Sequence, residues 1–191
     1  QPGDLIFVDS NNDGKITEDD RTQIGNPHPD FTMGLNLNFS YKGFDLNITG
    51  AGAFGQQIAK SYRSFADSPL QNYTTDIFGR WTGEGTSNKL PRLTSGSHTN
   101  WQNISDIYIE DGDYLKIQNL TIGYDFKKLF PTMPLGQARL YLTAQNLFTF
   151  TGYSGMDPEI GYGYDKSWVS GIDLGYYPSP RTYMVGVNLK F

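Results

Sequence analysis

The end of this chain alternates apolar and polar residues up to its last position. One parity is apolar and comprises Tyr183, Val185, Val187, Leu189 and Phe191. The other parity comprises Thr182, Met184, Gly186, Asn188 and Lys190. Side chains of a β-strand point alternately to opposite faces, so this period of two predicts a strand with one apolar and one polar face.

Four further segments alternate in the same way, namely residues 31–41, 44–49, 119–126 and 137–145. Lys42 and Gly43 separate the first two segments, and this spacing predicts a tight hairpin. Leu115 and Ile117 have the wrong parity for the strand that follows them. A β-bulge near Gln118 would restore a single apolar face, because a bulge adds one residue to a strand.

A soluble β-sandwich also alternates, but two features favour a transmembrane β-barrel. Aromatic residues stand at strand ends, as at Tyr41, Phe44, Phe126 and Phe191, where barrels carry their interfacial girdle. The connections are also unequal, being short at 42–43 and 127–136 and long at about 51–113 and 149–180. Short turns on one side and long loops on the other are typical of outer-membrane barrels. The predicted fold class is therefore all-β, with antiparallel transmembrane barrel strands and long extracellular loops.

Composition excludes several other classes. The chain has no cysteine, so it has neither disulfides nor thiolate metal sites. Its net charge of -5 argues against nucleic-acid binding. No apolar run approaches 18 residues, which argues against a transmembrane helix, whereas the alternating strands of a barrel average out to a polar composition.

Residues Asp9 to Asp20 have the spacing of an EF-hand-type calcium loop. Such a loop supplies oxygen ligands at positions 1, 3, 5, 7, 9 and 12 and has glycine at position 6. The predicted ligands are Asp9, Asn11, Asp13, Lys15 through its carbonyl, Thr17 and Asp20, with Gly14 at the glycine position. Asp at the last position replaces the usual glutamate and weakens the expected affinity. The alternative is a polar turn that binds nothing.

The flanks of this loop do not predict a pair of helices. Leu5 to Val8 favours a strand, and Gly25, Pro27 and Pro29 end any helix after the loop. We therefore expect an isolated loop that calcium holds rigid. If Phe191 ends at the periplasmic side, the alternating directions of the barrel strands in residues 31–191 make residues 1–30 an extracellular loop. Calcium outside cells is abundant enough for a weak site.

The order of the motifs resembles the C-terminal part of SusC-like TonB-dependent outer-membrane transporters. The matching segments are Pro2-Gly3-Asp4, the Asp9–Asp20 loop, Leu120–Tyr124, Gln145–Thr149, Asp157-Pro158-Glu159 and Pro180–Tyr183 with the terminal aromatic. The resemblance implies a 22-stranded barrel, of which this chain holds about five strands. The plug, the TonB box and the earlier strands would then belong to a longer protein, because an open sheet edge is not tolerated in lipid.

The resemblance also implies the function and the partners. Such transporters import oligosaccharides, or sometimes peptides, across the outer membrane of Gram-negative bacteria. They work with a SusD-like surface lipoprotein and are driven by TonB. Within the loop at 149–180, aromatic and acidic residues are candidates for contacts with the substrate or with the lipoprotein. They are Tyr153, Asp157, Glu159, Tyr162, Tyr164 and Trp168.

Two other interpretations have less support. Asp157 and Glu159 are two acids, but nothing predicts the pocket that a glycosidase needs to separate their pKa values, so no enzyme is expected. The alternative function is a secreted or surface calcium-binding β-sandwich for adhesion or carbohydrate binding. Finally, Ile58, Tyr62 and Phe65 lie at helical spacing and predict a short helix in the first long loop.

Overall fold

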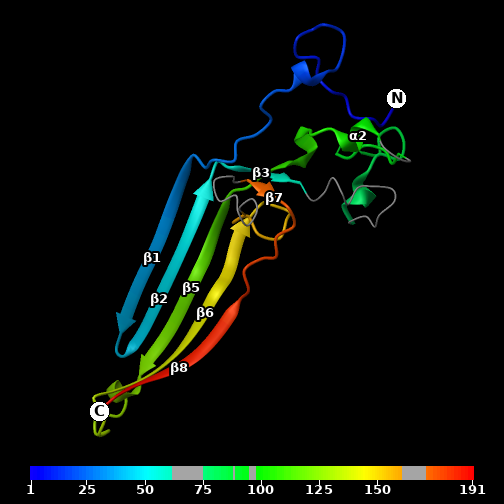
Figure 1. Ribbon diagram of the computed structural model, residues 1–191. Coiled ribbons are helices and arrows are strands. Elements are labelled where there is room, and N and C mark those ends of the chain that lie inside the picture. The colour runs from blue at the N-terminus through cyan, green and yellow to red at the C-terminus, as the bar shows by residue number, and fades with distance from the viewer. Residues whose placement is uncertain (62–74, 88, 95–97, 161–170) are drawn as a thin grey trace. The chain divides into compact units, whose positions relative to one another are not determined.

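The computed structural model divides the chain into two compact units (Figure 1). The structure describes residues 1–61, 75–87, 89–94, 98–160 and 171–191.

We call the first compact unit the loop unit, which comprises residues 1–28, 57–111 and 159–176. We call the second the sheet unit, which comprises residues 29–56, 112–158 and 177–191.

The sheet unit is a five-stranded antiparallel sheet. Its strands in spatial order are β1 (Phe31–Tyr41), β2 (Phe44–Phe54), β5 (Tyr114–Asp125), β6 (Gln137–Thr151) and β8 (Thr182–Lys190). Neighbouring strands pair antiparallel throughout. The prediction of antiparallel strands is therefore confirmed, although five strands do not close a barrel.

The predicted hairpin and the predicted bulge are both present. Lys42 and Gly43 have φ angles of 46° and 91°, as a two-residue turn of type I′ requires. On β5 the pairing shifts between Ile117 and Asn119, and Gln118 is the inserted residue. Above this bulge, Leu115 and Ile117 pair with Gly52 and Gly50, so their side chains join the apolar face.

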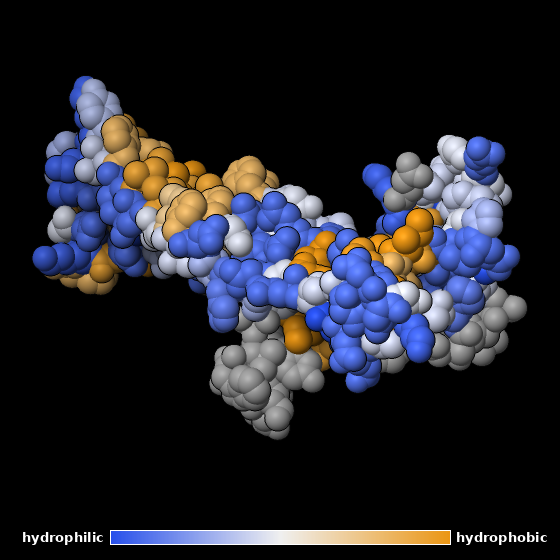
Figure 2. Space-filling view, turned by 90° about the horizontal axis from the view of Figure 1, so that it is seen from above, coloured by the Kyte–Doolittle hydropathy of each residue, from blue (hydrophilic) through white to orange (hydrophobic). Residues whose placement is uncertain are grey.

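One face of the sheet exposes apolar side chains. Leu37, Phe148 and Val185 are 52%, 53% and 74% exposed, and hydrophobic residues gather in a continuous area of the sheet (Figure 2). Among the described residues of the sheet unit, every strand belongs to this one sheet. A β-sandwich would bury these side chains between two sheets, so the sheet unit by itself does not have the core that the alternative function needs.

The opposite face carries polar side chains that bond to one another across the strands. Arg139 on β6 donates to both carboxylate oxygens of Asp45 on β2, at 2.7 and 2.5 Å. These residues reach each other across β5 because Gly123 stands between them. A Cβ atom there would lie 2.6 Å from the Arg139 guanidinium.

The same row continues to the last strand. The Arg139 guanidinium lies 4.8 Å from the centre of the Tyr141 ring, and that ring covers Gly186 on β8. Elsewhere on this face, the Thr121 and Thr143 hydroxyls are 2.9 Å apart, and the Asn47 amide donates to Asn38 at 2.6 Å. The polar face is thus largely paired within itself.

The turn between β5 and β6 is held by two side chains. It contains a short helix, η4 (Phe126–Lys128). The Asp125 carboxylate accepts hydrogen bonds from the backbone of Lys127 and Ala138. The Lys127 ammonium donates to the carbonyls of Pro131 and Met133, at 2.9 and 2.6 Å. This turn lies at the same end of the sheet as the Lys42-Gly43 hairpin, and we call it the short-turn end.

The loop unit contains a second small sheet and several short helices. Its strands, in spatial order, are β4 (Ile109–Asp111), β3 (Gln57–Lys60) and β7 (Ile172–Asp173). Its helices are η1 (Glu18–Asp20), η2 (Thr75–Gly79), α2 (Thr99–Gln102) and η3 (Asp106–Tyr108). Among the described residues, no helix has the length and apolar character needed to cross a membrane.

The predicted helix around Ile58 is wrong at that residue. Ile58 lies in β3, is 1% exposed and pairs with Glu110 of β4. Long-range pairing with β4 and β7 has overridden the local helical spacing. Tyr62 and Phe65 lie outside the described residues.

The segment Pro2-Gly3-Asp4 is anchored within the loop unit by fully and partly buried polar groups. Asn100, which is 0% exposed, donates to the Asp4 carboxylate at 2.9 Å and accepts from the Leu5 backbone at 3.0 Å. Arg92 forms an ion pair with Asp4 at 2.8 Å. Gly3 lies against the Trp81 ring, where a Cβ atom would be 2.5 Å from the nearest ring carbon.

Candidate functional site

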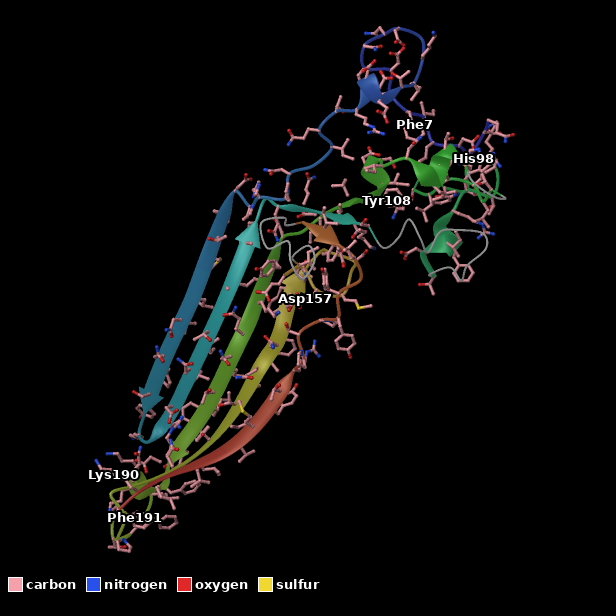
Figure 3. All side chains as sticks on the ribbon, viewed as in Figure 1. Phe7, His98, Tyr108, Asp157, Lys190 and Phe191 are labelled. Atoms are coloured by element: carbon pink, nitrogen blue, oxygen red, sulfur yellow. The ribbon has the colours of Figure 1, made fainter. Side chains whose placement is uncertain are left out.

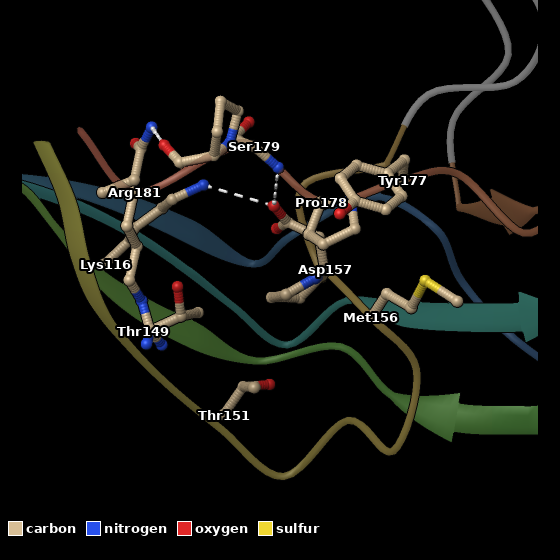
Figure 4. A pocket seen from close by; sticks show the side chains of 12 residues that line it. Lys116, Thr149, Thr151, Met156, Asp157, Tyr177, Pro178, Ser179 and Arg181 are labelled. Carbon is tan, nitrogen blue, oxygen red and sulfur yellow. Dashed lines mark hydrogen bonds and ion pairs between the residues drawn. The ribbon is translucent and has the colours of Figure 1, made fainter.

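A pocket of about 570 Å³ lies at the end of the sheet unit opposite the short-turn end (Figure 4). Lys116 of β5 and Thr149 and Thr151 of β6 line it from the sheet. Residues 156–158 and 177–181 line it from the segments that follow β6 and precede β8. The pocket thus stands on the polar side of the strands, among the residues of a long connection.

The centre of this pocket is an ion pair. The Lys116 ammonium lies 3.4 Å from the Asp157 carboxylate, and their side chains are 3% and 12% exposed. The bulge at Gln118 explains the position of Lys116, because it turns residue 116 toward the polar face. Two charges are buried here at a cost that their mutual attraction offsets, so the pair holds residue 157 against the sheet.

The segment before β8 is attached at the same place. The Ser179 backbone donates to the Asp157 carboxylate at 3.4 Å, and the Asn146 amide donates to the Pro180 carbonyl at 3.0 Å (Figure 4). Asn146 has a φ of 51°, and it lies within the irregular pairing of β6. Asp157, in the segment that follows β6, therefore contacts both β5 and the segment that precedes β8.

The predicted contact residues are distributed differently. Asp157 lines the pocket, Tyr153 is buried at 5% exposure with its ring over Gly155, and Glu159 is exposed. Tyr162, Tyr164 and Trp168 lie outside the described residues. Tyr177, which is 89% exposed, lines the pocket and offers a ring for stacking.

Sequence reasoning missed Lys116, Ser179 and Arg181 as pocket residues. Lys116 could have been found from the bulge itself. Once Leu115 and Ile117 are assigned to the apolar face, the lysine between them must point to the polar face. Ser179 and Arg181 carry no comparable signal, because they lie in or beside a connection without periodicity.

The predicted calcium loop is wound around its own carboxylates. The Asp9 carboxylate accepts from the backbone of Asp13 at 3.2 Å and of Gly14 at 2.8 Å. The Asn11 side-chain oxygen also accepts from Asp13, at 2.9 Å. Gly14 has a φ of 78°, a left-handed conformation that suits glycine. The loop is therefore tightly wound, with the Asp9 and Asn11 oxygens bonded to the backbone of residues 13 and 14.

Asp20 closes this loop as a helix cap. Its carboxylate accepts from the Ser10 backbone at 2.8 Å and from the Thr17 backbone at 2.7 Å, and it completes a capping box with Thr17. The backbone N–H of Thr17, with those of Ser10 and Asn11, holds the pKa of Asp20 below its ordinary value. Among the residues with described positions, no three His, Cys, Asp or Glu side chains group so as to hold a metal ion.

Comparison with known proteins places the whole chain in one class of receptors. No protein-family model matches it. It is 37% identical over 195 residues to TonB-dependent receptor P3 of Formosa agariphila, a match covering 100% of this chain and 19% of that protein. It is 29% identical over 193 residues to TonB-dependent receptor SusC of Bacteroides thetaiotaomicron, covering 100% of this chain and 18% of that protein. The chain thus spans about a fifth of the length of these relatives.

Solved structures agree with this result. The chain is similar to the RagAB peptide importer in its closed-closed state, with a TM-score of 0.73, 27% identity and coverage of 93% of this chain and 19% of that one. It is also similar to a structure of the RagAB peptide transporter, with a TM-score of 0.68, 28% identity and coverage of 86% and 17%. By its sequence over the whole length and by its sheet, the chain is thus related to TonB-dependent receptors, SusC among them.

Proposed function

We propose that this chain forms wall strands and outer loops of a nutrient importer in the outer membrane of a Gram-negative bacterium. The observation that carries the proposal is the two-faced sheet. Its apolar face is exposed where a soluble protein would bury it, as at Val185 with 74% exposure. Its polar face pairs with itself, as between Arg139 and Asp45. One face suits lipid and the other suits an aqueous interior.

The proposed partners follow from the relatives. Receptors named TonB-dependent and a transporter named RagAB indicate coupling to TonB and to a second, SusD-like lipoprotein. The loops of the sheet unit around the pocket would meet the substrate on its way in. In this proposal the importer takes up the substrate at these loops, and TonB drives its passage through parts of the protein outside this chain.

For the substrate we propose an oligosaccharide, with a peptide as the second candidate. The exposed Tyr177 ring beside Ser179 and the Lys116–Asp157 pair combines a stacking surface with hydrogen-bonding groups, as sugar binding needs. The relatives with solved structures are described as peptide importers, which supports the second candidate. Neutral hydroxyl groups and peptide groups both suit a pocket in which the Lys116 and Asp157 charges pair with each other.

The test is uptake by the full-length protein. Cells that carry it with its neighbouring lipoprotein should accumulate labelled oligosaccharides, and removal of TonB should abolish this accumulation. Tyr177→Ala should lower uptake, whereas Tyr176→Ala, its neighbour outside the pocket lining, serves as the matched control. Uptake of peptides alone would select the second candidate. TonB-independent behaviour and absence of the protein from outer membranes would refute the importer.

We also propose that the Asp9–Asp20 loop binds Ca²⁺ and so stiffens the loop unit. The ligands would be the Asp9, Asn11 and Asp13 side chains, the Lys15 carbonyl, Thr17 and Asp20. The inward winding of the loop supports this assignment. The donor role of Asp20 needs a rearrangement, because its oxygens already accept from Ser10 and Thr17. Calorimetric titration should show Ca²⁺ binding that Asp13→Ala weakens. If the folded protein releases or absorbs no heat on addition of Ca²⁺, the segment is a polar turn that binds no metal.

A further inference from the structure

The short-turn end of the sheet carries two lysines whose surroundings differ from those of an ordinary surface lysine. Lys42 forms the hairpin turn, and its ammonium lies 5.2 Å from the centre of the Tyr41 ring. Tyr41 belongs to the apolar face and is 60% exposed. A lysine over this ring stands at the outer rim of the sheet and not over its polar face.

The second lysine comes from the other turn. A Cβ atom on Gly43 would lie 2.9 Å from both Cβ and Cγ of Lys128. The stem of Lys128 therefore lies across the hairpin turn, next to the residue that carries Lys42. Two cationic side chains from separate turns thus start within one small area.

Hydrophobic side chains surround this area. Leu129 and Phe130, which follow Lys128 directly, are 56% and 51% exposed, and Phe39 on the apolar face is 57% exposed. Phe191, at the same end of the sheet (Figure 3), is 93% exposed. Aromatic rings with lysines beside them are typical of the level at which lipid head groups meet the hydrocarbon.

The acids at this end do not neutralise the two lysines. Asp45 is engaged by Arg139, and Asp125 accepts backbone hydrogen bonds from Lys127 and Ala138. Lys127 is itself occupied by two carbonyls. Among the residues whose positions are described, no carboxylate pairs with Lys42 or Lys128, so this area carries net positive charge beside an apolar surface.

We propose that Lys42 and Lys128 bind the phosphate of an anionic phospholipid head group at the short-turn end. The proposal rests on the proposed function, because it requires the sheet to lie in the outer membrane with its short turns at the periplasmic side, where the leaflet consists of phospholipids. The acyl chains would lie along the apolar face, next to Phe39 and Tyr41, and the phosphate would meet the two ammonium groups. Charge attraction of this kind favours phosphatidylglycerol over the zwitterionic phosphatidylethanolamine.

The test uses the full-length transporter reconstituted in bilayers of equal amounts of phosphatidylethanolamine and phosphatidylglycerol. Native mass spectrometry of the released protein gives the ratio of the two lipids that stay bound. We expect phosphatidylglycerol to be enriched, and Lys42→Gln with Lys128→Gln to lower that enrichment by roughly fivefold per lysine. Lys42→Arg with Lys128→Arg should keep the enrichment, because the charge remains.

A matched control removes the same charge elsewhere. Arg21→Gln with Lys89→Gln removes two exposed positive charges of the loop unit and should leave the lipid ratio unchanged. Heat-modifiable gel migration checks that every variant is folded. An unchanged ratio in the Lys42 and Lys128 variant, or an equal loss in the control, would overturn the proposal.

Uptake measured on the same proteins separates this proposal from the importer. Loss of the lipid preference with normal uptake supports the head-group site alone. Wild-type protein that enters bilayers and binds phosphatidylglycerol but imports nothing contradicts the importer and leaves the lipid result valid. Wild-type protein that does not enter bilayers refutes both.

Discussion

The sheet unit and the loop unit are held together in different ways. In the sheet unit, a regular backbone ladder carries five strands, and polar side chains such as Thr121 and Thr143 add pairs on top of it. In the loop unit, single buried groups such as Asn100 fix one stretch of backbone to another. The comparison teaches that the sheet should tolerate the loss of one polar group but not added bulk, whereas the loop unit should be sensitive to the loss of a single partner.

The largest effect is expected from added bulk on the polar face of the sheet. Gly123→Leu would drive a side chain into the Arg139–Asp45 pair and should lower the free energy of unfolding by about 3 kcal/mol. Urea unfolding of the full-length protein in lipid vesicles measures this change. Gly152→Leu, directly after β6, is the control, since a Cβ atom there meets nothing within 4 Å, and its cost should stay within about 0.5 kcal/mol. Equal costs would contradict the role given to Gly123.

A smaller but more local effect is expected in the loop unit. Asn100→Ala removes the side chain that accepts from the Leu5 amide and donates to the Asp4 carboxylate. Each of these partly buried groups then loses one hydrogen bond. The stability of this anchor should fall by about 2 kcal/mol. Hydrogen exchange of the Leu5 amide should become roughly 30-fold faster, while exchange in β5 and β6 stays unchanged.

Asn103→Ala provides the comparison for that variant, because Asn103 is exposed and lies three residues further on. It should leave the Leu5 amide protected. Faster exchange throughout the sheet in Asn100→Ala would show that the two units do not respond separately.

The loss of one polar partner in the sheet should matter less. Thr121→Val leaves the Thr143 hydroxyl without its 2.9 Å partner and should cost about 1 kcal/mol. Replacing both threonines by valine should recover most of that loss, since two apolar groups of the same shape leave no hydroxyl unpaired. Additive losses in the double variant would show that the two hydroxyls contribute independently.

The smallest effect concerns pH and the Asp9–Asp20 loop. The pKa of Asp20 is held below its ordinary value of 3.8, first by the Thr17 backbone N–H. A carboxyl group with a lowered pKa stabilises the folded loop at pH values above 3.8, and this contribution is lost as the pH falls through the folded pKa. Amide exchange of Ser10 and Thr17, compared at matched intrinsic rates, should therefore lose protection below that range. Asp20→Asn should lack this pH dependence.

The strands of the sheet could be predicted because their side chains alternate in hydropathy, and this includes the bulge beside Ile117. The second half of β2 could not. There Gly50, Ala51, Gly52 and Ala53 do not alternate in hydropathy, although they pair fully with β1 and β5. Position 50 requires glycine because a Cβ atom would lie 2.7 Å from the Lys116 carbonyl. A hydropathy pattern carries no information about such close contacts.

The site was harder to predict than the sheet. Asp157 was predicted because it is one of the acids among the aromatic residues of its loop, but its partner Lys116 lies 41 residues earlier and became a candidate only through strand register. Ile58 shows the reverse problem, since its local spacing suited a helix while its partner Glu110 lies far along the chain. Contacts between distant segments decide both positions, and local patterns carry little information about them.

The bulge at Gln118 has a consequence for the exchange of loops between related transporters. On either side of the bulge, the alternation of β5 side chains between the two faces of the sheet follows a different residue parity. An engineer who grafts foreign loops onto this wall should place the β5 junction on the loop side of Leu115. A junction that deleted the extra residue would turn the Lys116 ammonium toward the apolar face, so an otherwise harmless chimera would fail within β5, directly beside its new loop.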